Sequence, residues 1–88
     1  MANIYVVQHA ETQEMAAFHT REAAISFMWE QFSDCDLPVW STVTHQYEPI
    51  QNFVPLEQCL NFLKKFSLWQ LCDIFEGLCT IQEVKFFD

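Results

Sequence analysis

An apolar stripe with helical spacing lies between two groups of β-forming residues, and this order points to a mixed α+β fold. The stripe follows the i, i+3, i+4, i+7 pattern of one helix face and consists of Ile25, Met28, Trp29 and Phe32. Thr20 precedes it as an N-cap residue, and a proline at position 38 ends the helical geometry.

Strands are predicted on both sides of this helix. Residues 4–9 and 15–19 are rich in β-branched and aromatic side chains and predict a hairpin around a polar turn. Residues 39–47 predict a third strand, because Val43 and Tyr47 share the parity of its first residue and polar side chains occupy the other parity.

Two further helices are predicted in the second half of the chain. Residues 56–66 carry an apolar face, and Ser67 with Gln70 three residues later fits a capping box. One helix therefore ends near residue 66 and the next runs over 68–76, with Gly77 in the left-handed position past its end.

A last strand is expected over 79–87. Its apolar residues change parity between Ile81 and Val84, so we expect a bulge there or a short strand. The predicted order is ββαβααβ: a single α+β domain over residues 1–88, with three helices packed on one face of a small antiparallel sheet.

The composition predicts exposed apolar surface. Hydrophobic residues make up 51% of the 88 residues but charged residues only 18%, and a chain of this size buries roughly two-thirds of its surface. Exposed apolar side chains usually serve a partner or an oligomer. The aromatic candidates for such a surface are Trp40, which falls on the polar parity of its strand, Trp69, which lies beside the helix stripe, and Phe87.

The charge balance is strongly acidic, with twelve Asp and Glu, four Lys and Arg, and a net charge of −8. Direct binding to nucleic acid or to an anionic membrane is not expected, because both depend on basic side chains. The acids either keep the surface solvated or attract a basic protein partner. The acidic surface candidates are Glu11, Glu14, Glu22, Glu30, Asp34 and Asp36.

The cysteine and histidine residues give little indication of a catalytic or metal-binding site. The gaps between Cys35, Cys59, Cys72 and Cys79 are 24, 13 and 7 residues, whereas structural zinc sites use short spacings. Three of these thiols fall at apolar positions, and acids flank the fourth, which disfavours a thiolate. We therefore predict no catalytic residues, no metal and no cofactor, and keep a Cys/His metal-binding or enzymatic domain as a distant alternative.

The location expected from the sequence is the cytoplasm, with reduced thiols. The first residues lack the basic and apolar regions of a signal peptide, and no apolar run approaches the ~18 residues of a membrane span.

The leading functional hypothesis is a non-catalytic protein-binding module that inhibits or modulates a larger protein. In size and charge the chain resembles the small acidic inhibitors encoded by bacteriophages, among them anti-CRISPR and anti-restriction proteins. This resemblance of class, which no motif carries, implies a target with a basic, nucleic-acid-binding surface, carboxylates that imitate DNA phosphates, and action in the host cytoplasm. The alternative is a structural or assembly protein that forms homo-oligomers through exposed aromatics.

Overall fold

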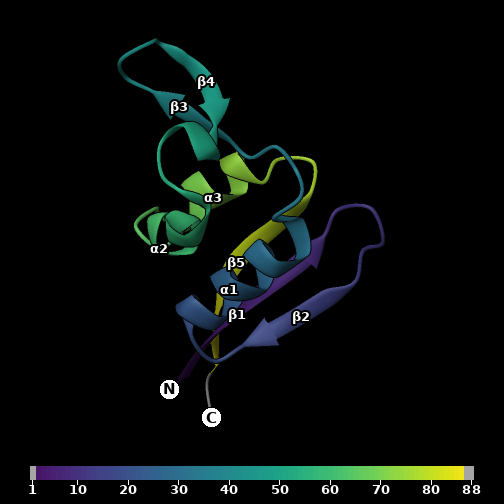
Figure 1. The fold of residues 1–88 in the computed structure, drawn as a ribbon. Coiled ribbons are helices and arrows are strands. Elements are labelled where there is room, and N and C mark those ends of the chain that lie inside the picture. Colours follow the sequence, from purple (N-terminus) through teal and green to yellow (C-terminus); the bar gives the residue numbers. More distant parts are fainter. Residues whose placement is uncertain (1, 87–88) are drawn as a thin grey trace.

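The computed structural model describes residues 2–86 and has the predicted α+β architecture (Figure 1). Phe87 therefore lies outside the described residues. Two single-turn 3₁₀ segments, Ile50–Asn52 and Leu56–Gln58, precede the second helix. The strands and helices in chain order are β1 (Ala2–His9), β2 (Met15–Phe18), α1 (Arg21–Phe32), β3 (Pro38–Ser41), β4 (Gln46–Pro49), α2 (Cys59–Leu63), α3 (Leu68–Ile74) and β5 (Cys79–Phe86).

The main sheet has three antiparallel strands in the order β2-β1-β5. β1 pairs with β5 residue for residue over eight positions, so the expected bulge is absent from these two strands. The change of parity instead reflects apolar residues on both faces of the sheet. Ile81 lies on the buried face, whereas Val84 pairs with Ile4 on the other face and remains 36% exposed. Glu83, which lies on the same face of the sheet as Ile81, accepts a hydrogen bond from Asn3 at 2.7 Å.

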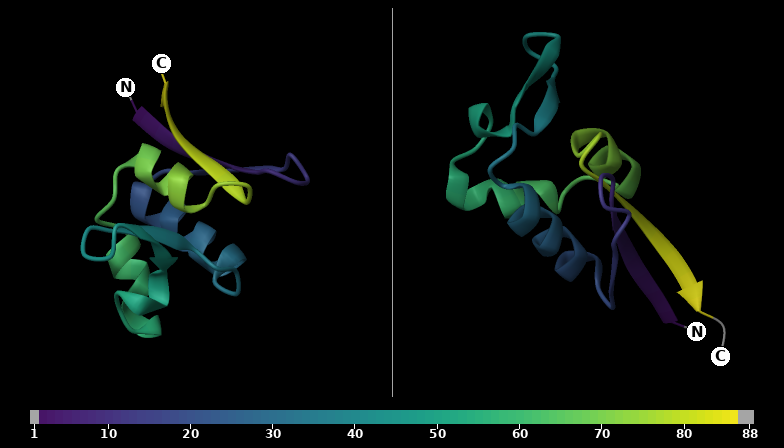
Figure 2. Two further views of the ribbon diagram at one scale, coloured as in Figure 1. Left: turned by 90° about the horizontal axis from the view of Figure 1, so that it is seen from above. Right: turned by 90° about the vertical axis from the view of Figure 1, so that its right-hand side faces the viewer.

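The helices lie on one side of this sheet, as predicted, and the other side is open (Figure 2, left). α1 begins at its predicted cap, where the Thr20 hydroxyl accepts a hydrogen bond from the Ala23 amide at 3.1 Å. α3 runs along the free edge of β5, where the Cys72 thiol contacts the amide and the carbonyl of Ile81 at 3.4 and 3.3 Å. α2 is farthest from the sheet and packs against α1.

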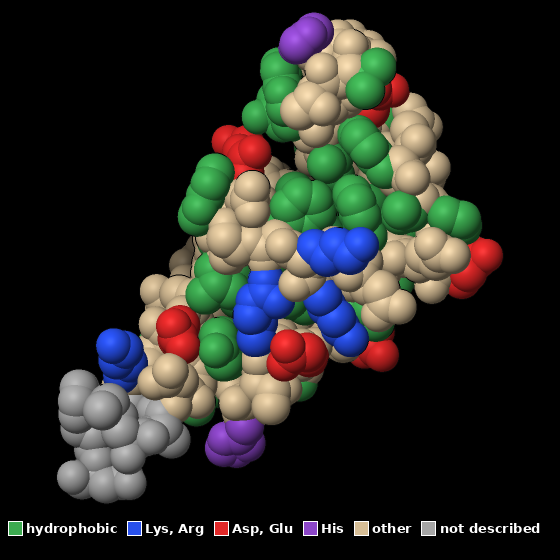
Figure 3. All heavy atoms as spheres, turned by 90° about the vertical axis from the view of Figure 1, so that its left-hand side faces the viewer, with side chains coloured by type: hydrophobic (Ala, Val, Ile, Leu, Met, Phe, Trp, Pro, Cys, Tyr) green, Lys and Arg blue, Asp and Glu red, His purple; other side chains and the backbone are tan. Residues whose placement is uncertain are grey.

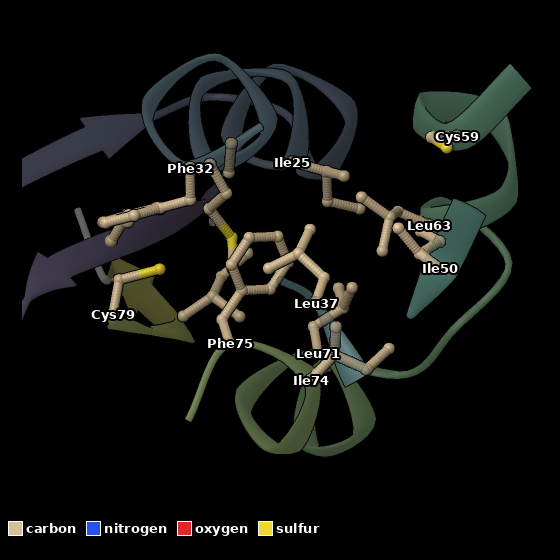
Figure 4. Close-up of a cluster of buried hydrophobic side chains, with 14 of the residues drawn as sticks. Ile25, Phe32, Leu37, Ile50, Cys59, Leu63, Leu71, Ile74, Phe75 and Cys79 are labelled. Carbon is tan, nitrogen blue, oxygen red and sulfur yellow. The ribbon is translucent and has the colours of Figure 1, made fainter. Parts of the chain in front are cut away.

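Phe75 occupies the centre of the hydrophobic core (Figure 4). It is fully buried and meets the Phe32 ring edge to face, with ring centroids 6.2 Å apart. Leu37 and Ile50 extend the core toward the second half of the chain, and the Ile50 amide donates a hydrogen bond to the Leu37 carbonyl at 2.9 Å. This bond holds the base of the β3–β4 segment on the body of the molecule.

The predicted third strand over 39–47 is a two-stranded hairpin of β3 and β4. The buried Ser41 hydroxyl accepts hydrogen bonds from the amides of Val43 and Thr44, and His45 takes a left-handed φ of 56°. These local bonds to a side chain stabilise a turn in place of an extended strand. The predicted burial of Val43 is therefore wrong, since at the turn it is 87% exposed. The hairpin projects away from the main sheet and gives the molecule its elongated shape, 47 × 26 × 23 Å (Figures 1 and 2).

Arg21 joins the first helix to the end of the second. Its guanidinium donates to the carbonyl of Lys64 at 2.7 Å and to the carbonyl of Phe66. These carbonyls follow the last turn of α2, where no further helical amide is available to donate to them. The Arg21 guanidinium therefore provides the donors for both.

Candidate protein-binding groove

A groove of about 410 Å³ separates the β3–β4 hairpin from α3. We call it the aromatic groove. It is formed by segments that lie far apart in the sequence, because residues of the hairpin and of α3 line the same hollow. Its lining consists of Val39, Trp40, Thr42, Tyr47, Phe66, Trp69, Gln70, Asp73 and Ile74.

Three of the lining side chains are large, aromatic and exposed. Trp40 is 49% exposed, Tyr47 55% and Trp69 73%. The indole of Trp40 faces outward because its strand neighbours Val39 and Ser41 face the core. Trp40 and Tyr47 are cross-strand partners, and their rings meet edge to face with centroids 5.1 Å apart and an interplanar angle of 73°.

The α3 side of the groove is set by the predicted capping box. The Ser67 amide donates to the Gln70 side chain at 2.9 Å, and the Ser67 hydroxyl accepts from the Gln70 amide at 3.4 Å. With its start fixed in this way, α3 presents Trp69 and Asp73, four residues apart, on one face. The Asp73 carboxylate accepts a hydrogen bond from the Tyr47 hydroxyl at 3.4 Å, which ties α3 to the hairpin.

Further aromatic side chains form a chain of ring contacts from Phe66 toward α2. The rings of Phe53 and Phe62 are stacked with centroids 6.1 Å apart, and Phe62 meets Phe66 edge to face at 5.2 Å. Phe66 itself lines the groove. Leu56, which is 61% exposed, is a further apolar side chain on this half of the molecule but does not line the groove.

The structure thus places two of the three aromatic candidates, Trp40 and Trp69, in the same groove. Tyr47 and Asp73 were not predicted as members of a site. Tyr47 was assigned to the buried face of a single strand, and only the hairpin turn reverses its direction and exposes it. The spacing of Trp69 and Asp73 on one helix was the sequence signal that could have connected Asp73 to the site.

The six acidic candidates are all exposed but do not all lie together. Glu11 and Glu14 lie in the β1–β2 turn, which meets the end of α1 where His9 contacts Phe32 at 5.4 Å between ring centroids. Glu30, Asp34 and Asp36 lie in or after that last turn of α1. Glu22 is at the opposite end of α1, on the order of 12 Å from Glu30 along the helix.

Glu22 belongs to a different electrostatic environment. It lies near Tyr5, whose pKa is raised by partial burial, by the hydrogen bond to Glu83 and by the neighbouring carboxylates. Basic side chains gather near the same end of α1, since Arg21 binds the Lys64 carbonyl and Lys65 follows. Figure 3 shows a group of Lys and Arg side chains below a hydrophobic area that reaches toward the hairpin.

A second, smaller pocket of about 250 Å³ lies between α1 and the β1–β2 end of the sheet. Its lining includes His9, Cys79 and Glu14. The Nδ1 atom of His9 accepts hydrogen bonds from the amides of Glu11 and Thr12 at 3.2 and 3.3 Å. These bonds stabilise the β1–β2 turn. Burial raises the pKa of Cys79 to about 12, which keeps it a thiol at neutral pH.

The four cysteines are free thiols, two of them buried and two half-buried. Burial and the nearby Glu57 raise the pKa of Cys59. Within residues 2–86, no three His, Cys, Asp or Glu side chains lie close enough to hold a metal ion. No helix of the described chain is both long and apolar enough to cross a membrane.

Comparison with protein-family models, with curated proteins and with solved structures found no match for this chain. The aromatic groove is therefore interpreted from its own geometry and chemistry.

Proposed function

We propose that this protein is a non-catalytic protein-binding module that docks on its partner through the aromatic groove. The observation that carries the proposal is the gathering of three exposed aromatic side chains, Trp40, Tyr47 and Trp69, around one concave surface. Exposed Trp and Tyr side chains next to a pocket are typical anchors of protein interfaces, because each contributes a large apolar area with little loss of side-chain freedom.

Local hydrogen bonds shape each wall of the groove. The capping box fixes the start of α3, and the Ser41 turn fixes the hairpin. A surface already held in its binding shape loses less entropy on association than a flexible one. The local bonds that shape both walls support a docking role for the groove.

The charge of the chain suits a partner with a basic surface. At −8, the protein attracts positively charged partners over distances of about a Debye length. We propose that it inhibits or modulates a larger, nucleic-acid-binding protein in the cytoplasm, in the manner of the phage-encoded acidic inhibitors that it resembles in class. In this role the acids at the β1–β2 turn and the end of α1 take the place of phosphates.

Affinity capture from cell lysate with matched variants tests the docking role. Trp69→Ala removes a side chain that is 73% exposed, so the fold should be kept while partners identified with the wild-type protein are lost. Leu56→Ala is the matched control, because Leu56 is 61% exposed and does not line the groove. Equal recovery of the same partners by both variants would refute docking through the groove.

The phosphate-mimic version has its own test. Reversing the charges of Glu14 and Asp34 to Lys should weaken binding of the captured partner, and more strongly at low salt. Unchanged affinity would remove the mimicry but leave the docking role.

Self-association is a second candidate function, and the open face of the main sheet favours it. Ile4 and Val6 lie there with Val84 and Met15, of which Val84 is 36% and Met15 65% exposed. Apolar side chains on an uncovered face can pair with a second copy. Sedimentation of the pure protein at tens of micromolar decides between the two roles, since a monomer there would exclude a homo-oligomer as the functional form.

A further inference from the structure

We infer that the aromatic groove receives an arginine side chain from the surface of the partner protein. This inference rests on the proposed docking function and adds the chemistry of the group that enters the groove. It is carried by the combination of exposed indole and phenol rings with a single carboxylate.

The aromatic rings provide the faces that a planar cation prefers. Trp40 and Tyr47 pack edge to face at 73° to each other, and both remain about half exposed, so ring surface is available to a ligand. Trp69, the most exposed of the three, forms the opposite wall on α3. Guanidinium groups stack on aromatic rings and are attracted by their electron-rich faces, most strongly by tryptophan.

Asp73 provides the charge complementarity. It carries the only formal charge among the described residues that line the groove. Its hydrogen bond from Tyr47, at 3.4 Å, is long for an O–H···O contact, so most of the accepting capacity of the carboxylate is left for a ligand. A carboxylate at the wall of an aromatic groove can bind a cation through an ion pair while the rings bind it through their electron-rich faces.

Arginine fits this arrangement better than other cationic side chains. Its guanidinium donates two parallel hydrogen bonds to one carboxylate while its plane stacks on a ring. The lysine ammonium is a compact and strongly hydrated charge. A trimethylated lysine has no N–H to donate to Asp73 and gains most from a closed aromatic cage, whereas this groove is open to solvent.

The three Trp indole N–H signals in an NMR titration test the inference with an internal control. The probe is the peptide Ac-Gly-Gly-Arg-Gly-Gly-NH₂, compared with the same peptide carrying citrulline, lysine or trimethyl-lysine. With arginine, the signals of Trp40 and Trp69 should move, and that of Trp29, half-buried on α1, should stay in place. Citrulline, which is neutral and of the same shape, should bind at least about fivefold more weakly.

Asp73→Asn keeps the shape of the groove and removes its charge. It should weaken arginine binding at least about fivefold, whereas Glu57→Gln, an exposed acid outside the groove, should leave it unchanged. Equal binding of citrulline, or tighter binding of lysine or trimethyl-lysine, would overturn the inference. So would the absence of any indole shift at about 20 mM arginine peptide.

The partner captured in the lysate experiment separates this inference from the proposed function. If Trp69→Ala and Asp73→Asn both lose the partner, both proposals are supported. If Trp69→Ala loses it and Asp73→Asn does not, the groove docks a protein without arginine, and only the inference fails. If Trp69→Ala retains the partner, the docking function fails as well.

Discussion

Replacing Arg21 by methionine should destabilise the fold by about 2 kcal/mol. The half-buried guanidinium donates to two backbone carbonyls, those of Lys64 and Phe66, just beyond α2. Hydrogen bonds from a charged group contribute roughly 1.5–3 kcal/mol each, and partial exposure lets water replace part of this. Since a domain of this size is stabilised by only roughly 4–13 kcal/mol in total, the loss is a large fraction of the whole.

Urea and thermal unfolding measure the effect. A loss of about 2 kcal/mol corresponds to a decrease in Tm of about 8–16 °C for a domain of this length. Lys65→Met, which removes an exposed charge next to the same carbonyls, is the control and should change stability by less than about 0.5 kcal/mol. Arg21→Lys keeps the charge but not the fork of donors, so it should fall between the two.

If Arg21→Met were as stable as Lys65→Met, the guanidinium bridge would not hold the two helices together, and the reasoning would be refuted. A change in the slope of unfolding against urea would mark a different failure, an altered native or denatured state in place of a lost interaction.

Two further predictions concern the capping box and the buried thiol. Ser67→Ala should cost about 1 kcal/mol in urea unfolding because the Gln70 amide loses its acceptor, whereas Ser67→Thr keeps the cap; equal stability of the two variants would contradict this. Cys79, with its pKa raised by burial to about 12, should make stability fall as the pH rises above about 9. There the unfolded chain loses the thiol proton and the folded chain does not, so the decrease approaches about 1.4 kcal/mol per pH unit. Cys79→Ala should remove this part of the slope, and an identical pH profile would count against it.

The features that the sequence predicted correctly depend on neighbours in the chain. The Thr20 cap, the capping box at Ser67 and the glycine at position 77, with its φ of 80°, each follow from hydrogen bonds or backbone freedom within four residues. The apolar stripe of α1 was equally local, because helical spacing alone brings Ile25 and Phe32 to one face. These interactions form in almost any tertiary context, which is why composition and spacing are sufficient to predict them.

The candidate site needed tertiary structure for its definition. The parity of residues 39–47 suggested one strand, but the Ser41 hydroxyl accepts hydrogen bonds from the amides of a turn. The chain direction reverses at this turn, and the Tyr47 side chain becomes exposed in the second strand of the hairpin. Likewise, both faces of the main sheet accept apolar residues, so the parity change in β5 required no bulge.

The sequence by itself determined an acidic α+β domain and made Trp40 and Trp69 candidates for an exposed aromatic surface. Only the fold decided that these two indoles share a groove with Tyr47 and Asp73, because the hairpin meets α3 through a contact between residues 26 positions apart. Local spacing carries no information about such an encounter, which depends on how the core around Leu37 and Ile50 packs.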